Sequence, residues 1–163
     1  MPNDLVITSS SQAQLKFSSL LVSSFVDSHS PIINYPLQWT PPSTLLVKYN
    51  CDGAFNRHSA IIGIIGRNSD GFMVDGSSSC VNAASSLQTK LIAIRETCFI
   101  INRRFLHAIV ESDCKMAIDL LTYEMIPPSD CAIIVEDIKV IGSDLSIYFS
   151  CAPWSYNKAV LCC

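Results

Sequence analysis

Apolar residues along the chain gather in five short runs that have the length and composition of β-strands. The runs cover residues 45–51, 58–67, a stretch that begins at Phe72, 107–112 and 145–151. Asn68-Ser-Asp-Gly71, between the second and third runs, contains the residues that tight turns prefer. The pattern therefore predicts that the first three strands form an antiparallel meander.

A helical period follows the third run. Leu87, Leu91, Ile94, Cys98 and Ile101 recur every three or four residues, which predicts a helix over 84–104 with one buried stripe. The other predicted helices are 115–122, 130–141 after Pro127-Pro128, and a short terminal one within 154–163. Helices precede both the fourth and the fifth strand, so each of these strands is reached through a helical crossover. This order predicts an α/β fold with a five-stranded mixed sheet flanked by helices.

The chain divides near residue 43 into two parts of different composition. Residues 1–43 are rich in serine and proline without a sustained period, so we expect a tail and linker. Residues 44–163 carry the regular patterns and are long enough for one domain with its own core. The apolar stretch 15–26 resembles a short signal segment. Serines interrupt it and no basic residue precedes it, which assigns it to the tail.

Composition excludes several functional classes. No stretch reaches the roughly 18–20 apolar residues of a transmembrane helix, so no membrane span is expected. The eight cysteines form no Cys-x-x-Cys pair, and the three histidines have no ligand-like spacing to them. This favours reduced thiols in an intracellular protein, nuclear or cytoplasmic, over a disulfide scaffold or a zinc site. The net charge of −3 means that nucleic acid could bind only through a local basic patch.

Four strings occur in an order and at separations that match a known family. They are Trp39-Thr-Pro-Pro with Val47-Lys-Tyr-Asn-Cys-Asp52-Gly53-Ala54-Phe55, Gly66-Arg-Asn-Ser-Asp-Gly71, Leu87-Gln-Thr-Lys-Leu-Ile-Ala-Ile-Arg-Glu96 and Val110-Glu-Ser-Asp113. Through them residues 39–161 resemble the ribonuclease H (RNase H) type 1 family, and within it the plant retroelement-derived domains that often follow a reverse transcriptase. The resemblance implies the RNase H-like fold and an RNA–DNA hybrid or other nucleic acid as the partner.

The resemblance also implies a candidate active site. In that family four carboxylates hold two Mg²⁺ or Mn²⁺ ions, which activate water and stabilise the leaving oxygen during hydrolysis of the RNA strand. Asp52 and Asp113 match two of the four positions and are the candidate catalytic and metal-binding residues. Lys90 and Leu161 stand at the other two, and Cys151 replaces a histidine. Because two close dications repel, the loss of two anionic ligands predicts little or no hydrolysis.

The candidate site residues also have simpler interpretations. An aspartate before glycine, such as Asp52, is often a turn residue, and Asp113 could cap the following helix. Lys90 either reaches water as an ordinary helix-edge lysine, or lies between the two aspartates and replaces a metal as their counter-charge. Glu111, two residues before Asp113, is either a further member of this cluster or a solvated charge at its rim.

A local basic strip is the remaining candidate feature. Its predicted members, besides Lys90, are Arg95, Arg103, Arg104 and Lys115. Arg103 and Arg104 have an alternative role as partners of the dipole at the C-terminal end of the long helix.

The residues leave three functions open. The sequence favours a weakly nucleic-acid-binding RNase H-like domain with a degenerate metal site, which could belong to a larger reverse-transcriptase-derived polyprotein. One alternative is an active hybrid ribonuclease that uses Asp52 and Asp113. Another is an unrelated α/β protein-interaction module, in which these aspartates are turn and cap residues.

Overall fold

The computed structural model describes residues 39–57, 59–104 and 107–157. Residues 1–38, most of the predicted tail, and residues 158–163, which include Leu161, lie outside this description. The elements in chain order are β1 (Val47–Phe55), β2 (Ala60–Arg67), β3 (Met73–Val81), α2 (Ser86–Arg104), β4 (Ala108–Ser112), α3 (Lys115–Thr122), α4 (Ala132–Asp144), β5 (Tyr148–Cys151) and α5 (Trp154–Asn157).

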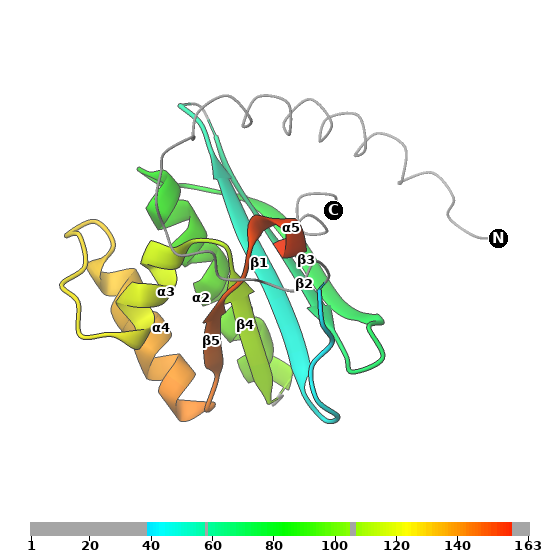
Figure 1. Cartoon of the computed structure of the whole chain (residues 1–163). Coiled ribbons are helices and arrows are strands. Elements are labelled where there is room, and N and C mark those ends of the chain that lie inside the picture. Colours follow the sequence, from blue (N-terminus) through cyan, green and yellow to red (C-terminus); the bar gives the residue numbers. More distant parts are fainter. Residues whose placement is uncertain (1–38, 58, 105–106, 158–163) are drawn as a thin grey trace, which may run out of the picture.

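The five strands form one sheet in the order β3-β2-β1-β4-β5. β2 pairs antiparallel with both β1 and β3, whereas β4 pairs in parallel with both β1 and β5. Parallel neighbours need crossover connections, which α2 and the α3–α4 pair supply (Figure 1). The predicted five-stranded mixed sheet flanked by helices is confirmed.

β1 extends beyond its predicted end at residue 51 and reaches Phe55. Asp52 and Gly53 belong to the ladder, where they lie opposite Gly63 and Ile62 of β2. Aspartate and glycine disfavour strands, which is why the pattern ended the strand before them. Pairing with β2 overrides that preference, and it places Asp52 inside the sheet instead of in a turn.

Local hydrogen bonds move the helix boundaries away from the predicted ones. α2 begins at Ser86, not at residue 84, because the Ser85 hydroxyl accepts a 3.1 Å hydrogen bond from the backbone N–H of Gln88. α4 continues to Asp144, and Ser146, just after its C-cap Leu145, has a left-handed φ of 52° that terminates the helix. β5 consequently begins at Tyr148, three residues later than predicted.

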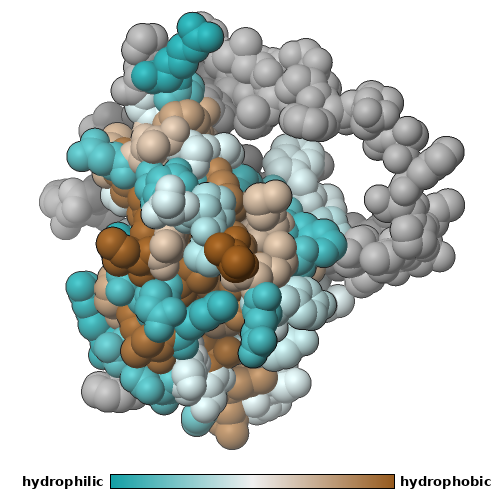
Figure 2. Space-filling view, turned by 90° about the vertical axis from the view of Figure 1, so that its left-hand side faces the viewer, coloured by the Kyte–Doolittle hydropathy of each residue, from teal (hydrophilic) through white to brown (hydrophobic). Residues whose placement is uncertain are grey.

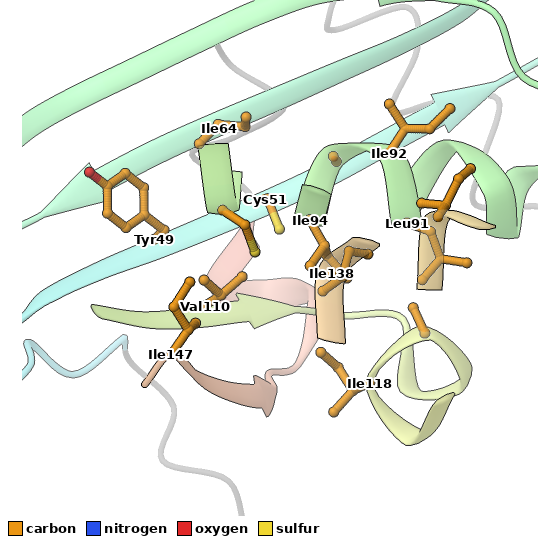
Figure 3. Close-up of a cluster of buried hydrophobic side chains, with 14 of the residues drawn as sticks. Tyr49, Cys51, Ile64, Leu91, Ile92, Ile94, Val110, Ile118, Ile138 and Ile147 are labelled. Carbon is orange, nitrogen blue, oxygen red and sulfur yellow. The ribbon is translucent and has the colours of Figure 1, made fainter. Parts of the chain in front are cut away.

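α2 packs its apolar stripe against the sheet. Leu91, Ile94, Cys98 and Ile101, four of the five predicted stripe residues, have no exposed surface. Figure 3 shows this cluster, in which the stripe meets side chains from the strands and from α4: Tyr49, Cys51, Ile64, Val110 and Ile138. Burying each of the larger side chains stabilises the fold by about 1.5–3 kcal/mol, so α2 is held firmly against β1.

Trp39 covers part of the opposite face of the sheet. Its ring lies 5.6 Å from Lys48 Nζ and 4.9 Å from the Arg67 guanidinium carbon, measured to the ring centre. Lys48 Nζ also donates to the backbone oxygen of Thr40 at 2.9 Å. Residues at the end of the predicted tail therefore contact the domain. No helix in residues 39–157, as far as they are described, is long and apolar enough to cross a membrane.

Leu45 adopts a left-handed backbone conformation in the turn before β1. Its φ is 74° and its side chain is 90% exposed, so little burial offsets the strain. We expect Leu45→Gly to raise the free energy of unfolding by about 0.5–1 kcal/mol in urea denaturation. Thr44→Gly is the matched control. Thr44 lies in the same turn without a positive φ, so its replacement should lower stability; a loss of stability in both variants would contradict this account.

Candidate functional site

Asp52 is a buried carboxylate near the middle of the sheet. It is 4% exposed, and one of its oxygens accepts a 2.7 Å hydrogen bond from the backbone N–H of Gly53. Burial of an ionised carboxylate is costly unless a counter-charge and hydrogen bonds accompany it. The surroundings of Asp52 must therefore supply a positive partner.

Gly53 lets α2 approach β1 closely enough to supply that partner. A Cβ atom at position 53 would lie 2.7 Å from Thr89 Cγ2 and 3.0 Å from the Thr89 backbone carbonyl carbon. Only glycine leaves room for this contact. Thr89 is followed by Lys90, so the close approach brings the lysine side chain to Asp52.

Lys90 bridges the two predicted site aspartates. Its ammonium group donates to Asp52 Oδ1 at 2.5 Å and to Asp113 Oδ1 at 2.6 Å. Asp113 follows β4, which is the parallel neighbour of β1, so both carboxylates reach the same place from adjacent strands. This is the second of the two arrangements considered for Lys90. The N-cap of α3 is Cys114, not Asp113.

The charges of this Lys90 cluster, Asp52, Lys90 and Asp113, support one another. Burial disfavours the charged lysine, but the two carboxylates outweigh this effect and raise the pKa of Lys90 above its ordinary value. Burial raises the pKa of the Asp52 carboxyl; Lys90 opposes that shift and Asp113 adds to it. Lys90 therefore stays protonated at neutral pH, and the ionised cluster carries one excess negative charge.

Glu111 belongs to a second buried cluster instead of joining the first. One of its carboxylate oxygens lies 2.8 Å from Lys48 Nζ, and the other accepts a 2.9 Å hydrogen bond from Asn50 Nδ2. Lys48 and Asn50 were not predicted as partners of Glu111. A signal was present, because Lys48, Asn50 and Asp52 alternate along an apolar strand and so mark one face of it.

The predicted basic strip is spread over separate places. Arg95 lies 3.3 Å from Asp137, Arg104 lies 2.9 Å from Asp75, and Lys115 lies 2.5 Å from Asp119. Lys90 and Arg104 are about 20 Å apart along the axis of α2. Each of these cations already faces a carboxylate, whereas Arg103 is exposed at the end of α2. Arg104 also lines a hollow of about 390 Å³ together with Tyr49 and Val74.

The side chains around Asp52 and Asp113 do not fit a pair of divalent metal ions. The described ranges contain no group of three or more His, Cys, Asp or Glu side chains able to hold a metal. A cation bridging these two carboxylates would meet the Lys90 ammonium, which repels it. Leu161, at the position of a further ligand in the resemblance, lies outside the described residues.

Comparison with known proteins places this arrangement in a familiar fold. Neither a protein-family model nor a curated protein sequence matches the chain. One similar structure is the N-terminal RNase H domain of a Mycobacterium tuberculosis protein, solved as a fusion with maltose-binding protein. It is 14% identical, the match covers 72% of this chain and 88% of that chain, and the TM-score is 0.65. RNase H1 from Halobacterium salinarum is 16% identical, the match covers 71% of this chain and 91% of that chain, and the TM-score is 0.60. The chain has the ribonuclease H fold.

A viral structure shares the RNase H fold as part of a larger chain. This structure is the foamy viral protease-reverse transcriptase in complex with an RNA/DNA hybrid, which is 11% identical to this chain. The match covers 86% of this chain and 21% of that chain, and the TM-score is 0.58. The resemblance to RNase H is thus confirmed at the level of the fold. The sheet and helices are those of RNase H domains, so the α/β fold of this chain is not unrelated to that fold.

Proposed function

We propose that the chain is a plant retroelement-derived RNase H-like domain that binds nucleic acid weakly and hydrolyses it little or not at all. The observation that carries the proposal is the position of Lys90, whose ammonium group lies 2.5 Å from Asp52 and 2.6 Å from Asp113. By resemblance, these two carboxylates belong to a two-metal site. Here one tethered cation satisfies both of them.

The electrostatics of the cluster oppose two-metal hydrolysis. A pair of divalent ions needs several anionic ligands, because the ions repel each other strongly at close range. The Lys90 cluster offers two carboxylates and one ammonium, a net charge of −1. Lys90 keeps its proton because Asp52 and Asp113 raise its pKa. An incoming metal would have to displace a charged side chain that the fold holds in place.

Nucleic acid as the partner rests on the fold and on exposed cations. The foamy viral enzyme that shares this fold was captured with an RNA/DNA hybrid. In this chain Arg103 is exposed, and Lys115 projects with 75% of its side chain exposed. The net charge of −3 keeps the expected affinity low, and in the described residues five cations already pair with carboxylates: Lys48, Lys90, Arg95, Arg104 and Lys115. A chain of this kind would act in the nucleus or the cytoplasm.

The full chain should not cleave a labelled RNA–DNA hybrid in Mg²⁺ or Mn²⁺ above the buffer background. Asp52→Asn should leave that result unchanged, because the carboxylate has no metal to hold. Denaturing gel electrophoresis of an end-labelled RNA strand measures the cleavage. Magnesium-dependent cleavage that disappears in Asp52→Asn would contradict the proposal and favour an active hybrid ribonuclease.

Binding is tested separately by fluorescence anisotropy of the same hybrid. We expect a Kd between about 10⁻⁴ and 10⁻⁶ M at physiological salt, the range of non-specific electrostatic binding. Arg103→Gln should weaken binding and flatten its salt dependence. Arg104→Gln is the matched control and should have a smaller effect, because Asp75 already pairs with Arg104. Binding whose strength does not change with salt concentration would contradict the proposed electrostatic mode.

A further inference from the structure

Large apolar side chains are exposed along α4 and the loop that precedes it. Ile126 is 96% exposed and Ile133 is 77% exposed. The set, here called the α4 surface, consists of Tyr123, Met125, Ile126, Ile133 and Val140. Figure 2 views the side of the molecule that carries α3 and α4, where brown hydrophobic areas lie among teal hydrophilic ones. Single exposed apolar residues are ordinary, but five within 18 positions mark a contact surface.

α4 is apolar on two sides, although only one of them faces the core. Ile134, Val135 and Ile138 are buried. Ile133 and Val140 are exposed, seven residues apart, and therefore lie on one outward stripe with Glu136 between them. A surface helix normally presents polar residues outward. The outward stripe of α4 has the spacing with which one helix contacts another.

The segment that carries the α4 surface is strongly negative. Residues 121–150 contain five acidic residues and one basic residue, Lys139, which gives a formal net charge of −4, whereas the whole chain carries −3. Four of the acidic residues are exposed: Glu124, Asp130, Glu136 and Asp144. The fifth, Asp137, pairs with Arg95 of α2 and fixes α4 to the domain. The apolar stripe is therefore flanked by exposed acidic side chains of its own segment.

We propose that the α4 surface is a docking site for a basic amphipathic helix of another protein. The apolar face of such a helix would lie along Ile133 and Val140, and its lysine or arginine residues would meet Glu124 and Glu136. This occupant follows from charge complementarity. The site is separate from the Lys90 cluster, and the proposal does not depend on nucleic-acid binding.

The charges disfavour the other occupants. A second copy of the chain would bring two 121–150 segments, each of formal net charge −4, together, and like charges repel. Residues 1–38 contain two aspartates, Asp4 and Asp27, and one cation, Lys16, so the chain's own tail is not basic. Nucleic acid would be repelled by the same acidic side chains.

The test uses the full chain and three labelled 18-residue helical peptides in fluorescence anisotropy. The first peptide is built from leucine and lysine on opposite faces, the second has glutamate in place of lysine, and the third has serine in place of leucine. Only the first should bind. Ile133→Ser and Glu136→Lys should each weaken its binding by about tenfold, because each removes one of the two complementary features.

Two controls separate docking from unfolding and from general stickiness. Ile133 and Glu136 are exposed, so both variants should keep the thermal unfolding midpoint of the parent chain. Phe72→Ser removes an apolar side chain that is 71% exposed beside β3, outside the α4 surface, and should leave peptide binding unchanged.

Several results would overturn the proposal. Equal binding of the leucine–glutamate peptide would remove the charge argument, and full binding by Ile133→Ser would remove the apolar one. Light scattering that shows a dimer abolished by Ile133→Ser would make a second copy the occupant. Displacement of the peptide by a synthetic peptide of residues 1–38 would make the tail the occupant, and displacement by an RNA–DNA hybrid would assign the surface to nucleic acid.

Discussion

Lys90→Met should lower the free energy of unfolding by about 3–5 kcal/mol at pH 7, because it leaves two buried carboxylates without their common counter-charge. Asp52 and Asp113 both contact the Lys90 ammonium, so the substitution removes two charge-assisted hydrogen bonds at once. Methionine keeps the length and the packing of the lysine stem. Urea denaturation followed by circular dichroism measures the loss.

The cost of Lys90→Met should depend on pH in a defined direction. In the parent chain the pKa of Lys90 is higher in the folded state than in the unfolded state, so its protonation stabilises the fold. This stabilisation is complete below the unfolded-state pKa of about 10.4 and is lost only as pH rises through the folded-state pKa. It is therefore constant between pH 5 and 9. In the variant, the loss of Lys90 removes the charge that opposed the raised pKa of Asp52, so this carboxyl binds a proton more readily and the folded state gains stability as pH falls. The difference between variant and parent should shrink from pH 7 toward pH 4.

Lys115→Met is the matched control for this experiment. Lys115 also contacts a carboxylate, Asp119 at 2.5 Å, but 75% of its side chain is exposed. Water screens such a pair, so its loss should change stability little. An equally small effect in Lys90→Met would show that the buried bridge contributes nothing, and would contradict the account of the site.

Lys90→Glu should convert the bridge into a site that binds a divalent cation. Three carboxylates would then meet where the ammonium now lies, and their mutual repulsion should make folding dependent on an added cation. If the Kd for Mn²⁺ lies 100-fold below the free Mn²⁺ concentration, the ion stabilises the variant by about 2.7 kcal/mol. Thermal unfolding with and without Mn²⁺ and a chelator measures this effect. The parent chain and Lys90→Gln should show no such shift.

The same variant extends the test to catalysis. Lys90→Glu combined with Leu161→Asp should cleave an RNA–DNA hybrid more than the sum of the two single variants, because by resemblance both positions carry ligands of one site. Equal stabilisation of parent and Lys90→Glu by Mn²⁺ would mean that the parent already has a cation site, and the proposed loss of hydrolysis would fail with it.

Local pattern was sufficient to predict the sheet and its long helix, because both have strong periods. The apolar stripe from Leu91 to Ile101 has the spacing of a helix, and the tight turn at Asn68–Gly71 is closed by the Gly71 N–H to Asn68 carbonyl hydrogen bond of 3.0 Å. The predicted ends of helices were less accurate where a single residue determines them. The Ser85 cap and the left-handed Ser146 are such positions, since each shifts an element by a few residues without changing the period.

The candidate site was only partly accessible from sequence. The resemblance brought Asp52, Lys90 and Asp113 together, but it left two interpretations of Lys90 open, because a lysine at a helix edge can turn either way. The choice depends on the Gly53–Thr89 contact, which joins segments far apart in sequence. The Lys48–Glu111 pair escaped prediction for the same reason, since its partners come from β1 and β4.

The Lys90 bridge also changes how the carboxylates depend on their surroundings. A bound metal ion exchanges with solution, so its occupancy follows the ion concentration. A cation attached to the chain is present in one copy per molecule, and its effective concentration is set by the fold and not by the cell. The counter-charge that Asp52 and Asp113 share is therefore put in place by folding itself. Chelators and fluctuations in cellular magnesium should leave the domain unaffected, because it carries its own counter-ion.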